Sequence, residues 1–339
     1  MSGGDGSMEY KICFVYQAPH PSHKGFAESV NAIFSYYLFT NLQVPWSIKC
    51  VLRGLTLPKA DIYICEGGAP LIPVWVKKKF NRRAVNIELV GDETFMILED
   101  RHGKISRHDL YLRLIKTVMK EIDGALAVSR LTEESIKKYL DIPTAVVYPY
   151  IEEELYKRLI YVNPNLESCN IVSVAHGRFS KGMDILVKAF EIVRREFKEA
   201  ELFIVGKGHP KDWEKINGIR VLGYVENLGR VFEKCSLFVQ SSRFDAFPVA
   251  TLEALRAGLP AIVTEMTGTK EVVEKLRKDF VRKVDAEDIA NGILKYFDLS
   301  EEEKSKLSEK ARELSEPFNK SEMCERFKKE FWRIVEEVL

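Results

Sequence analysis

Residues 242–275 read SRFDAFPVATLEALRAGLPAIVTEMTGTKEVVEK, and this stretch places two carboxylates, Asp245 and Glu253, eight positions apart. The pattern predicts a loop at Asp245, followed by a helix that begins near Phe247 or Pro248 and holds Glu253 one to two turns further on. The first turn of a helix has free N–H groups and the positive end of the helix dipole, which suit a phosphate or a sugar hydroxyl. The stretch therefore indicates a nucleotide-sugar site. The alternative is an N-capping Asp on an ordinary buried helix.

A second motif, NIVSVAHGRFSKGMDILVKAF, occupies residues 170–190. It predicts a buried strand, a turn at Gly177 and an amphipathic helix with its apolar face at Ile185, Leu186, Ala189 and Phe190. Arg178 and Lys181 follow the turn. A Lys in the first turn of a helix is unfavourable beside the positive dipole unless an anion joins it, so these cations indicate an anionic ligand. Solvated surface residues are the alternative.

The rest of the second half repeats short apolar runs separated by helical stretches. The strands that these runs predict are 201–210, 218–226, 235–242 and 259–265. Such an alternation favours a parallel sheet with helices on both faces, and ligands of such sheets bind beyond the carboxyl ends of the strands. Gly177, Gly206, Gly223 and Asp245 all fall at or just beyond those ends.

The first half shows the same organisation with weaker signals. Its predicted strands are 10–17, 61–68, 83–93, 124–129 and 144–150, interleaved with helical stretches such as 28–39 and 110–122. The fold class is therefore α/β with two βα domains, which suits a chain of 339 residues. The final stretch, 317–339, places Met323, Phe327, Phe331, Trp332 and Val335 in a helical pattern.

The two motifs of the second half resemble the donor-binding signature of retaining glycosyltransferases with the GT-B fold (glycosyl transferases group 1, family 4-like). The resemblance implies two Rossmann-like βαβ domains facing a central cleft, with a C-terminal helix that crosses back to the first domain. The expected parts are an acceptor-side domain at 8–156, a nucleotide-sugar-binding domain at 157–317 and the returning helix at 318–339. A hinge near 148–156 is expected to close the domains when donor binds.

The resemblance also implies roles for residues. Asp245, with the loop amides, would hold the transferred sugar, and Arg178 and Lys181 would bind the donor diphosphate and stabilise its developing charge; these three are the catalytic candidates. The donor-binding candidates are Gly177, Gly206, Gly208, Tyr224, Phe247, Pro248, Val249 and Glu253, of which Glu253 would bind the ribose hydroxyls. Two features depart from the family: Asp245 stands where a Glu is usual, and two residues rather than four separate Arg178 from Lys181.

The acceptor side resembles the family less closely. Val90, Gly91 and Asp92 stand where the family often has His-Gly-Asp, so the imidazole that often touches the sugar is missing. The usual Gly-Gly loop near the N-terminus is reduced to Gly25, and His23 or His20 could compensate. The acceptor-side candidates are thus His23, Gly25, Gly91 and Asp92, with solvated loop histidines as the alternative.

Composition bounds the remaining expectations. A net charge of +1 gives no reason to expect a nucleic-acid partner. The six cysteines contain no CxxC pair, and we expect neither a signal peptide nor a transmembrane segment, which together favour a cytoplasmic protein that begins at Met8. The sequence lacks Asp-x-Asp, so no metal is expected at the diphosphate and no cofactor besides the nucleotide-sugar substrate. Abundant Lys and Glu with only three Gln lean towards a thermophilic source.

One stretch raises the question of a membrane. Residues 71–83, LIPVWVKKKFNRR, place Trp75 and Phe80 beside five cations, as in helices that lie on anionic lipid. Peripheral contact through Trp75–Arg83, at the inner membrane face, is one interpretation. The favoured one is a surface helix whose cations complement its own C-terminal dipole.

Together these features predict a retaining, metal-independent glycosyltransferase that moves a hexose from a nucleotide diphosphate sugar to a hydroxyl acceptor, either a saccharide or a lipid-linked one. Two alternatives stay open: a UDP-sugar epimerase of the same fold, and a non-catalytic nucleotide-sugar-binding protein. The sequence leaves open the donor base, the sugar, the acceptor and the oligomeric state.

Overall fold

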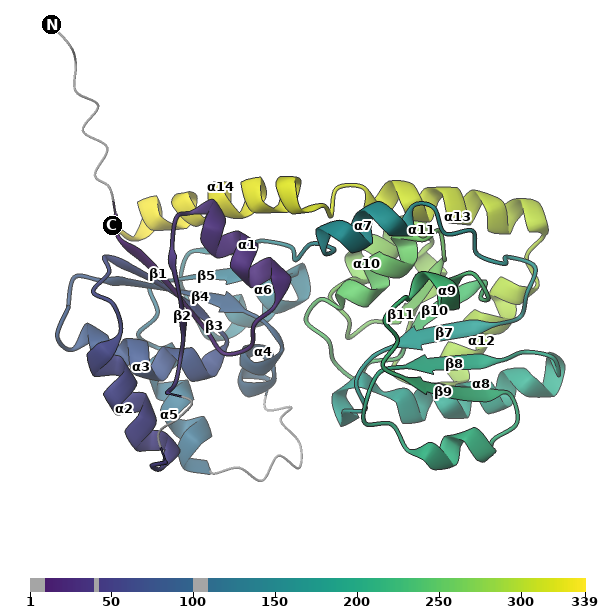
Figure 1. The fold of residues 1–339 in the computed structure, drawn as a ribbon, viewed down its shortest axis with the longest axis horizontal. Helices are drawn as coiled ribbons and strands as arrows, with labels where there is room; N and C mark the ends of the chain where they lie inside the picture. The colour runs from purple at the N-terminus through teal and green to yellow at the C-terminus, as the bar shows by residue number, and fades with distance from the viewer. Residues whose placement is uncertain (1–9, 40–42, 100–108) are drawn as a thin grey trace, which may run out of the picture. The chain divides into compact units, whose positions relative to one another are not determined.

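The computed structural model describes residues 10–39, 43–99 and 109–339. The chain divides into two compact units, each an α/β domain (Figure 1). Unit 1 comprises Met1–Val128, Thr132–Val147 and Cys324–Leu339, and unit 2 comprises Ser129–Leu131 and Tyr148–Met323.

The described part of unit 1 is built on a six-stranded parallel sheet with strand order β2-β1-β3-β4-β5-β6. Its strands are β1 (Ile12–Tyr16), β2 (Ile33–Tyr36), β3 (Ile62–Glu66), β4 (Val85–Val90), β5 (Gly124–Ala127) and β6 (Thr144–Val146). The helices around it are α1 (Pro21–Ser29), α2 (Trp46–Thr56), α3 (Gly68–Lys78), α4 (Asp92–Leu98), α5 (Asp109–Met119), α6 (Arg130–Tyr139) and α14 (Lys320–Val338). The central strands are buried along nearly their whole length because both faces of a parallel sheet are covered.

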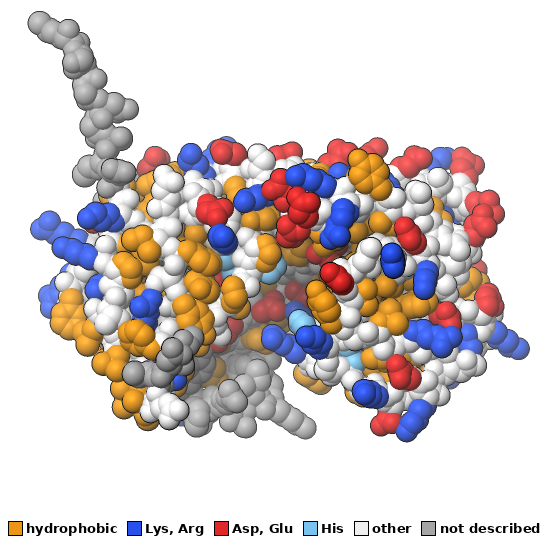
Figure 2. Space-filling model, in the orientation of Figure 1, with side chains coloured by type: hydrophobic (Ala, Val, Ile, Leu, Met, Phe, Trp, Pro, Cys, Tyr) orange, Lys and Arg blue, Asp and Glu red, His pale blue; other side chains and the backbone are white. Residues whose placement is uncertain are grey.

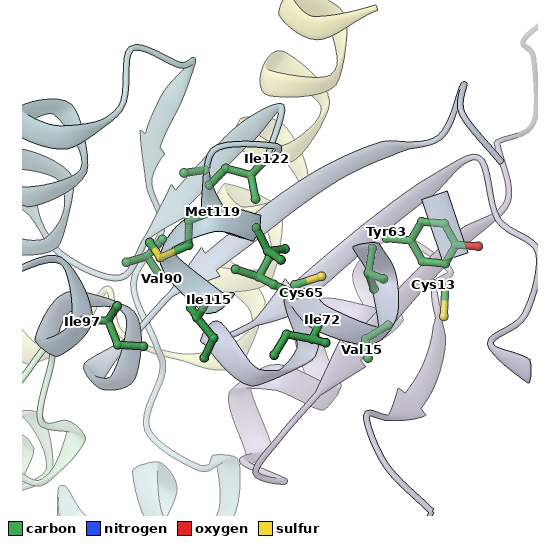
Figure 3. Packing of buried hydrophobic residues seen from close by; sticks show 14 of the residues in the cluster. Cys13, Val15, Tyr63, Cys65, Ile72, Val90, Ile97, Ile115, Met119 and Ile122 are labelled. Carbon is green, nitrogen blue, oxygen red and sulfur yellow. The ribbon is translucent and has the colours of Figure 1, made fainter. Parts of the chain in front are cut away.

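One face of this sheet packs against α3 and α5 through a buried apolar cluster (Figure 3). Val90 belongs to that cluster, together with Ile97 of α4 and Met119 of α5, and its side chain is 0% exposed. Position 90 therefore serves packing in this chain. An apolar side chain there fits the core, whereas an imidazole would have to find a buried hydrogen-bond partner.

Residues 28–39, which we expected to be helical, are not a helix. Helix α1 ends at Ser29, Asn31 adopts a left-handed conformation with φ 51°, and Ile33–Tyr36 form strand β2. That strand pairs in parallel with β1, with Ile33 opposite Cys13. The reason is that β-branched and aromatic side chains fit a pleated edge, and sheet pairing outweighs a short helical pattern.

Helix α14 packs on unit 1, so the expected return of the C-terminal helix to the first domain is confirmed. Phe327 stacks on Phe26 of α1 with ring centroids 4.4 Å apart, and Arg333 donates to the backbone oxygen of Thr144 at 2.9 Å. Of the five residues predicted on its apolar face, four are buried and Trp332 is partly exposed. Acidic and basic side chains are intermixed along α14 on the face drawn in Figure 2, in keeping with the balanced net charge.

The described residues of unit 2 form a second six-stranded parallel sheet, with strand order β12-β11-β10-β7-β8-β9. Its strands are β7 (Ile171–Val174), β8 (Leu202–Val205), β9 (Ile219–Gly223), β10 (Leu237–Gln240), β11 (Ala261–Thr264) and β12 (Val281–Arg282). Its α-helices are α7 (Glu153–Leu159), α8 (Met183–Glu196), α9 (Gly229–Phe232), α10 (Val249–Arg256), α11 (Lys270–Leu276), α12 (Ala286–Phe297) and α13 (Glu301–Ser315). Three 3-10 turns complete the unit: η1 (Phe179–Lys181), η2 (Lys211–Lys215) and η3 (Lys278–Phe280).

The strand order gives each sheet one switch point, where the chain reverses its direction across the sheet. In unit 2 the chain runs outward from β7 to β8 and β9, then returns to place β10 on the other side of β7. In unit 1 it runs from β1 to β2, then returns to place β3 on the other side of β1. Ligands of open α/β sheets bind at such points, beyond the carboxyl ends of the two strands.

Candidate functional site

The loops that follow β7 and β8 lie side by side at the carboxyl edge of the unit 2 sheet, and the loop after β7 borders the switch point. Gly177 N–H donates to the backbone oxygen of Lys207 at 2.9 Å, so the two loops lie back to back. A Cβ on Gly177 would stand 2.1 Å from the Gly208 oxygen, and one on Gly206, whose φ is 128°, would stand 1.9 Å from the Ala175 oxygen. The glycines are required because backbone occupies the space that a side chain would need.

The loop after β10 is tied to the loop after β7 across the switch point. Phe244 N–H donates to the Ser180 oxygen at 3.1 Å, and Ser241 Oγ donates to the Gly182 oxygen at 3.0 Å. Arg243 forms a bidentate ion pair with Asp184, with both N···O distances 2.6 Å, and its guanidinium lies 4.0 Å from the ring centroid of Phe179. These contacts fix the η1 turn. The sequence motifs did not single out Arg243 or Asp184, because their spacing of 59 residues shows no pattern before folding.

Lys181 and Asp245 meet at this point. Lys181 Nζ lies 2.7 Å from Asp245 Oδ2, and their side chains are only 14% and 8% exposed. Lys181 is in η1, ahead of the left-handed Gly182 (φ 62°), so it does not lie in the first turn of α8 as we expected. The charge on Lys181 is thus offset by a carboxylate of its own chain rather than exposed to the dipole of α8.

The Asp245 loop is held from its other side by the segment after β11. Asp245 N–H donates to the Met266 oxygen at 3.1 Å, and Gly268 N–H donates to the Asp245 oxygen at 2.9 Å. Phe247 is buried, and its ring centroid lies 5.3 Å from that of Tyr148. Since its ring serves packing, Phe247 can offer a ligand its backbone rather than its side chain.

Helix α10 begins at Val249 with Pro248 as its N-cap, as the sequence predicted. Glu253 lies in its second turn and is partly exposed. Burial, and then the nearby charge of Glu152, raise the pKa of its carboxyl to about 7. No hydrogen bond or ion pair joins that carboxyl to another of the described residues. A carboxyl in this setting is suited to accept hydrogen bonds from a ligand.

The other two donor-side candidates are exposed. Arg178 is the N-cap residue of η1 and its side chain lies at the surface. Tyr224 follows β9, is 72% exposed and has Lys207 Nζ 5.5 Å from its ring centroid. The structure therefore brings Gly177, Gly206, Gly208, Lys181 and Asp245 together at one rim of the sheet. Arg178 and Tyr224 flank the same loops, and among the described residues neither the Arg178 guanidinium nor the Tyr224 hydroxyl has a hydrogen-bond partner.

On the acceptor side, Gly25 does not form a loop. It is buried within α1, which spans Pro21–Ser29, so its backbone belongs to the helix. His23 lies in the first turn of that helix, Gly91 is the N-cap of α4 and Asp92 is the first residue of α4. Sequence reasoning missed Glu66, which ends β3 and accepts from the backbone N–H of Gln17 at 2.9 Å. The run Glu66-Gly67-Gly68 at the end of a predicted strand was the available signal.

The cationic stretch Trp75–Arg83 is partly paired. Trp75 Nε1 donates to Glu121 at 2.9 Å, Lys78 lies 2.8 Å from Asp123, and Lys79 lies 3.3 Å from Glu121. These acidic partners give a structural reason for the cations and leave membrane contact without support. Within the part of the chain that the structure describes, no helix combines the length and apolar character needed to span a membrane. In the same residues, no cluster of three or more His, Cys, Asp or Glu side chains could hold a metal ion.

Residues 170–298, which contain both loops and the Lys181–Asp245 pair, match the family model described as glycosyl transferases group 1. This part of the chain is similar to the glycosyl transferases group 1. The group 1 match begins one residue before β7 and ends one residue after α12, so it covers most of unit 2.

Curated relatives of the chain are named as glycosyltransferases. The chain is 24% identical over 245 residues to poly(glycerol-phosphate) alpha-glucosyltransferase of Bacillus subtilis, which covers 68% of this chain and 36% of that protein. It is 29% identical over 324 residues to an uncharacterized glycosyltransferase of Methanocaldococcus jannaschii, covering 92% of this chain and 82% of that protein. The chain thus spans about a third of the length of the Bacillus enzyme and most of the archaeal protein.

Solved structures show the same fold. Anabaena HepE, solved in complex with UDP and glucose, matches with a TM-score of 0.75 at 15% identity, covering 96% of this chain and all of that one. The GT-B fold expected from the sequence is confirmed by the two parallel six-stranded sheets with flanking helices and by the structural match to HepE.

Proposed function

We propose that this protein is a retaining, metal-independent glycosyltransferase that transfers a hexose from a nucleotide diphosphate sugar to a hydroxyl acceptor. The observation that supports this most directly is the Lys181–Asp245 pair, a nearly buried cation and carboxylate at the switch point of the group 1 domain. A cation and a carboxylate at one point provide one partner for a phosphate and one for a sugar hydroxyl.

In this proposal Lys181 changes partner when donor binds. The diphosphate brings more negative charge than one carboxylate, so it competes for the ammonium, and Asp245 becomes free to accept from a hydroxyl of the transferred sugar. Arg178, exposed beside η1, adds a second cation to the diphosphate. Glu253 accepts from the ribose hydroxyls through a carboxyl that has no partner among the described residues.

The chemistry in this proposal needs no protein base. The bond between the anomeric carbon and the diphosphate oxygen breaks, and the acceptor hydroxyl forms its bond to that carbon on the same face. The hydroxyl proton passes to the departing phosphate oxygen. Lys181 and Arg178 stabilise the charge that develops on the diphosphate, and such preorganised electrostatic stabilisation is often the largest single contribution to rate.

Two relatives suggest which donor to test first. The Bacillus relative is named as a glucosyltransferase, and HepE was solved with UDP and glucose. We therefore propose UDP-glucose as the first donor, with GDP- and ADP-sugars as the comparison.

Thermal unfolding with UDP-, GDP- and ADP-sugars tests donor binding. A ligand present at 100 times its dissociation constant adds about 2.7 kcal/mol of stability, which is easily seen as a higher melting temperature. The reaction of the bound donor with an acceptor panel, followed by NMR, then gives the anomeric configuration of the product. The same transfer reaction in excess chelator tests whether activity needs a metal ion.

Each outcome decides one part of the proposal: donor binding, retention of configuration or metal independence. Sugar transfer that retains the anomeric configuration and continues in chelator supports all three. No stabilisation by any nucleotide sugar overturns donor binding, an inverted product overturns retention, and loss of activity in chelator overturns metal independence. Binding without turnover, or a sugar epimer formed without acceptor, assigns the protein to one of the two alternatives given above.

A further inference from the structure

The switch point of unit 1 lies between β1 and β3, and two histidines lie just beyond it. His20 is the N-cap of α1, His23 is in the first turn of the same helix, and Glu66 ends the neighbouring β3. The two imidazole rings have centroids 5.3 Å apart. A pair of partly exposed imidazoles thus occupies the place where a ligand of this sheet is expected.

The hydrogen bond of His20 fixes its tautomer. The backbone N–H of Ser22 donates to His20 Nδ1 at 3.2 Å, so Nδ1 has no proton of its own. In a neutral imidazole one nitrogen accepts and the other bears the proton. His20 Nε2 therefore bears the proton and is a hydrogen-bond donor.

The hydrogen bond of His23 fixes the opposite tautomer. His23 Nδ1 lies 3.0 Å from the backbone oxygen of Ala18, and a carbonyl oxygen can only accept, so Nδ1 bears the proton. His23 Nε2 is therefore a bare acceptor. Among the described residues, neither Nε2 atom has a hydrogen-bond partner.

Glu66 holds this arrangement in place. Its Oε2 atom accepts from the backbone N–H groups of Gln17 at 2.9 Å and of Ala18 at 3.2 Å, which holds in place Ala18, the residue whose carbonyl accepts the hydrogen bond from His23 Nδ1. The same oxygen lies 4.0 Å from His23 Nδ1. Glu66 is thus a positioning residue, acting on the tautomer of His23 through the 17–18 backbone.

Both rings are held neutral. Burial lowers the pKa of His20, and burial followed by the nearby His20 lowers the pKa of His23 to about 4, against the opposing effect of the Ala18 hydrogen bond. A neutral donor and a neutral acceptor offer little to a phosphate, which prefers cations. They suit uncharged hydroxyls, each of which can donate and accept.

We propose that His20 and His23 form a binding site for two neighbouring hydroxyls of one saccharide, with His23 Nε2 accepting from one hydroxyl and His20 Nε2 donating to the other. That the saccharide is the acceptor substrate rests on the proposed function. The site itself does not, since it is defined by unit 1 alone. An acceptor recognised in this way is a polyol or sugar rather than a phosphate.

Two-bond ¹H–¹⁵N spectra of the full chain with labelled histidine test the tautomers without any activity. At pH 7 we expect protonated Nε2 in His20 and protonated Nδ1 in His23, with the signals assigned from the two variants described below. Titration with methyl glucoside should move the Nε2 signal of His23 towards that of a hydrogen-bonded nitrogen, and inorganic phosphate should not. The same tautomer in both rings, or a response to phosphate and none to the glycoside, overturns the proposal.

Two variants keep the fold while removing one function each. His20→Asn retains an N-capping oxygen for α1 but loses the ring donor. His23→Phe retains a ring against Phe14, whose centroid is 6.2 Å away, but loses the acceptor nitrogen. Each should raise the acceptor KM about three- to tenfold, the effect of one lost hydrogen bond. Lys24→Ala, an exposed cation on the same helix, is the matched control and should leave KM unchanged.

Titrations with UDP-glucose and with UDP separate the two sugars that could supply the hydroxyls. If His23→Phe raises the acceptor KM and leaves both titrations unchanged, the hydroxyl pair belongs to the acceptor. If it weakens UDP-glucose but not UDP, the pair belongs to the donor sugar and the acceptor assignment is wrong. Unchanged KM and unchanged titrations in both variants overturn the site, whereas a failure of all nucleotide binding in the wild type counts against the proposed function alone.

Discussion

Lys181 Nζ and Asp245 Oδ2 lie 2.7 Å apart, which joins two strand ends separated by 64 residues of sequence. Each residue comes from a loop held by other contacts: η1 is fixed by Arg243, and the Asp245 backbone is fixed by the Met266–Gly268 segment. The pair therefore lies on loops that are held in place by contacts other than its own ion pair.

The first prediction concerns this pair as a source of stability. Lys181→Met and Asp245→Asn should each lower the free energy of unfolding by about 1–3 kcal/mol, because each leaves the other charge nearly buried and without its partner. The double variant should cost less than the sum, by about 0.5–3 kcal/mol. Urea denaturation of the four proteins measures this cycle. If the losses in the free energy of unfolding of the two single variants add up to that of the double variant, the interaction between Lys181 and Asp245 does not stabilise the fold.

The second prediction concerns Arg178. Because its side chain is exposed, Arg178→Ala should leave the melting temperature unchanged, while turnover at saturating donor should fall roughly a hundredfold, as when one stabilising donor is lost. Lys188→Ala removes an exposed cation from α8 in the same unit and is the matched control. Equal turnover in the two variants would remove Arg178 from the proposed diphosphate site.

The third prediction separates the two carboxylates. Glu253→Gln should weaken UDP and UDP-glucose alike, by about 1.5–3 kcal/mol for charge-assisted bonds to ribose, whereas Asp245→Asn should act on UDP-glucose and on turnover and leave UDP nearly unaffected. Calorimetric titration with both ligands measures this. If Asp245→Asn weakens UDP as much as Glu253→Gln does, Asp245 is a loop cap rather than a sugar ligand.

The pH dependence of nucleotide binding provides a further check on Glu253. Its pKa of about 7 means that the carboxyl is mostly protonated at pH 6 and mostly ionised at pH 8. Since the ionised form accepts hydrogen bonds more strongly, wild-type affinity for UDP should rise across this range, and the part of that rise due to Glu253 should be missing in Glu253→Gln. Parallel pH curves for the two proteins would contradict the ribose assignment.

The fourth prediction compares two glycines. Gly177→Ala should destabilise unit 2 and abolish nucleotide binding, because its Cβ would stand 2.1 Å from the Gly208 oxygen and must push the two loops apart. Gly91→Ala is the matched control, since an ideal Cβ there meets nothing within 4 Å. Thermal unfolding with and without UDP measures both. A Gly177→Ala protein that binds UDP normally would show that the contact between the loops is not required.

The fifth prediction concerns Glu88, which is 0% exposed in β4 and has one carboxyl oxygen, Oε2, without a partner among the described residues. Burial, opposed by the hydrogen bond from Thr94 and reinforced by Glu93 and Glu66, raises its pKa from 4.5 to about 8. Between these two values the unfolded chain is ionised while the folded protein keeps its proton. Stability from this group is therefore complete below pH 4.5 and falls as pH rises towards 8.

Glu88→Gln removes the loss of stability that Glu88 causes as pH rises from 4.5 to 8. Relative to wild type, the variant should become more stable between pH 4.5 and pH 8, by about 1.4 kcal/mol for each unit of pKa difference that the folded protein maintains. Urea denaturation at both pH values measures the difference in the free energy of unfolding between the two proteins. The other carboxyls with a raised pKa are present in both proteins, so their contributions cancel in this difference. An equal difference in stability at the two pH values would mean that Glu88 is ionised throughout.

The sequence by itself determined the fold class and most of the elements of unit 2. Short apolar runs predicted β7 to β11, with glycine at or just beyond the ends of the first three, and the pattern around Ile185 and Phe190 predicted the buried face of α8. These predictions succeed because they depend on local periodicity and on turn residues, both of which can be recognised in the sequence without knowledge of tertiary contacts. Residues 28–39 show the limit, since there the pairing of β2 with β1 decided between helix and strand.

Only the tertiary structure decided which groups meet. The sequence separated Lys181 and Asp245 into two motifs with different ligands, and the strand order β10-β7 brings them into one ion pair. It gave no sign that Glu66, through the Gln17–Ala18 backbone, would set the tautomer of His23, or that position 90 lies inside an apolar core. The partners of a side chain depend on which strand ends become neighbours, and the strand order of the sheet decides that. The apolar composition of a strand depends only on how deeply that strand is buried, so it can be recognised before the strand order is known.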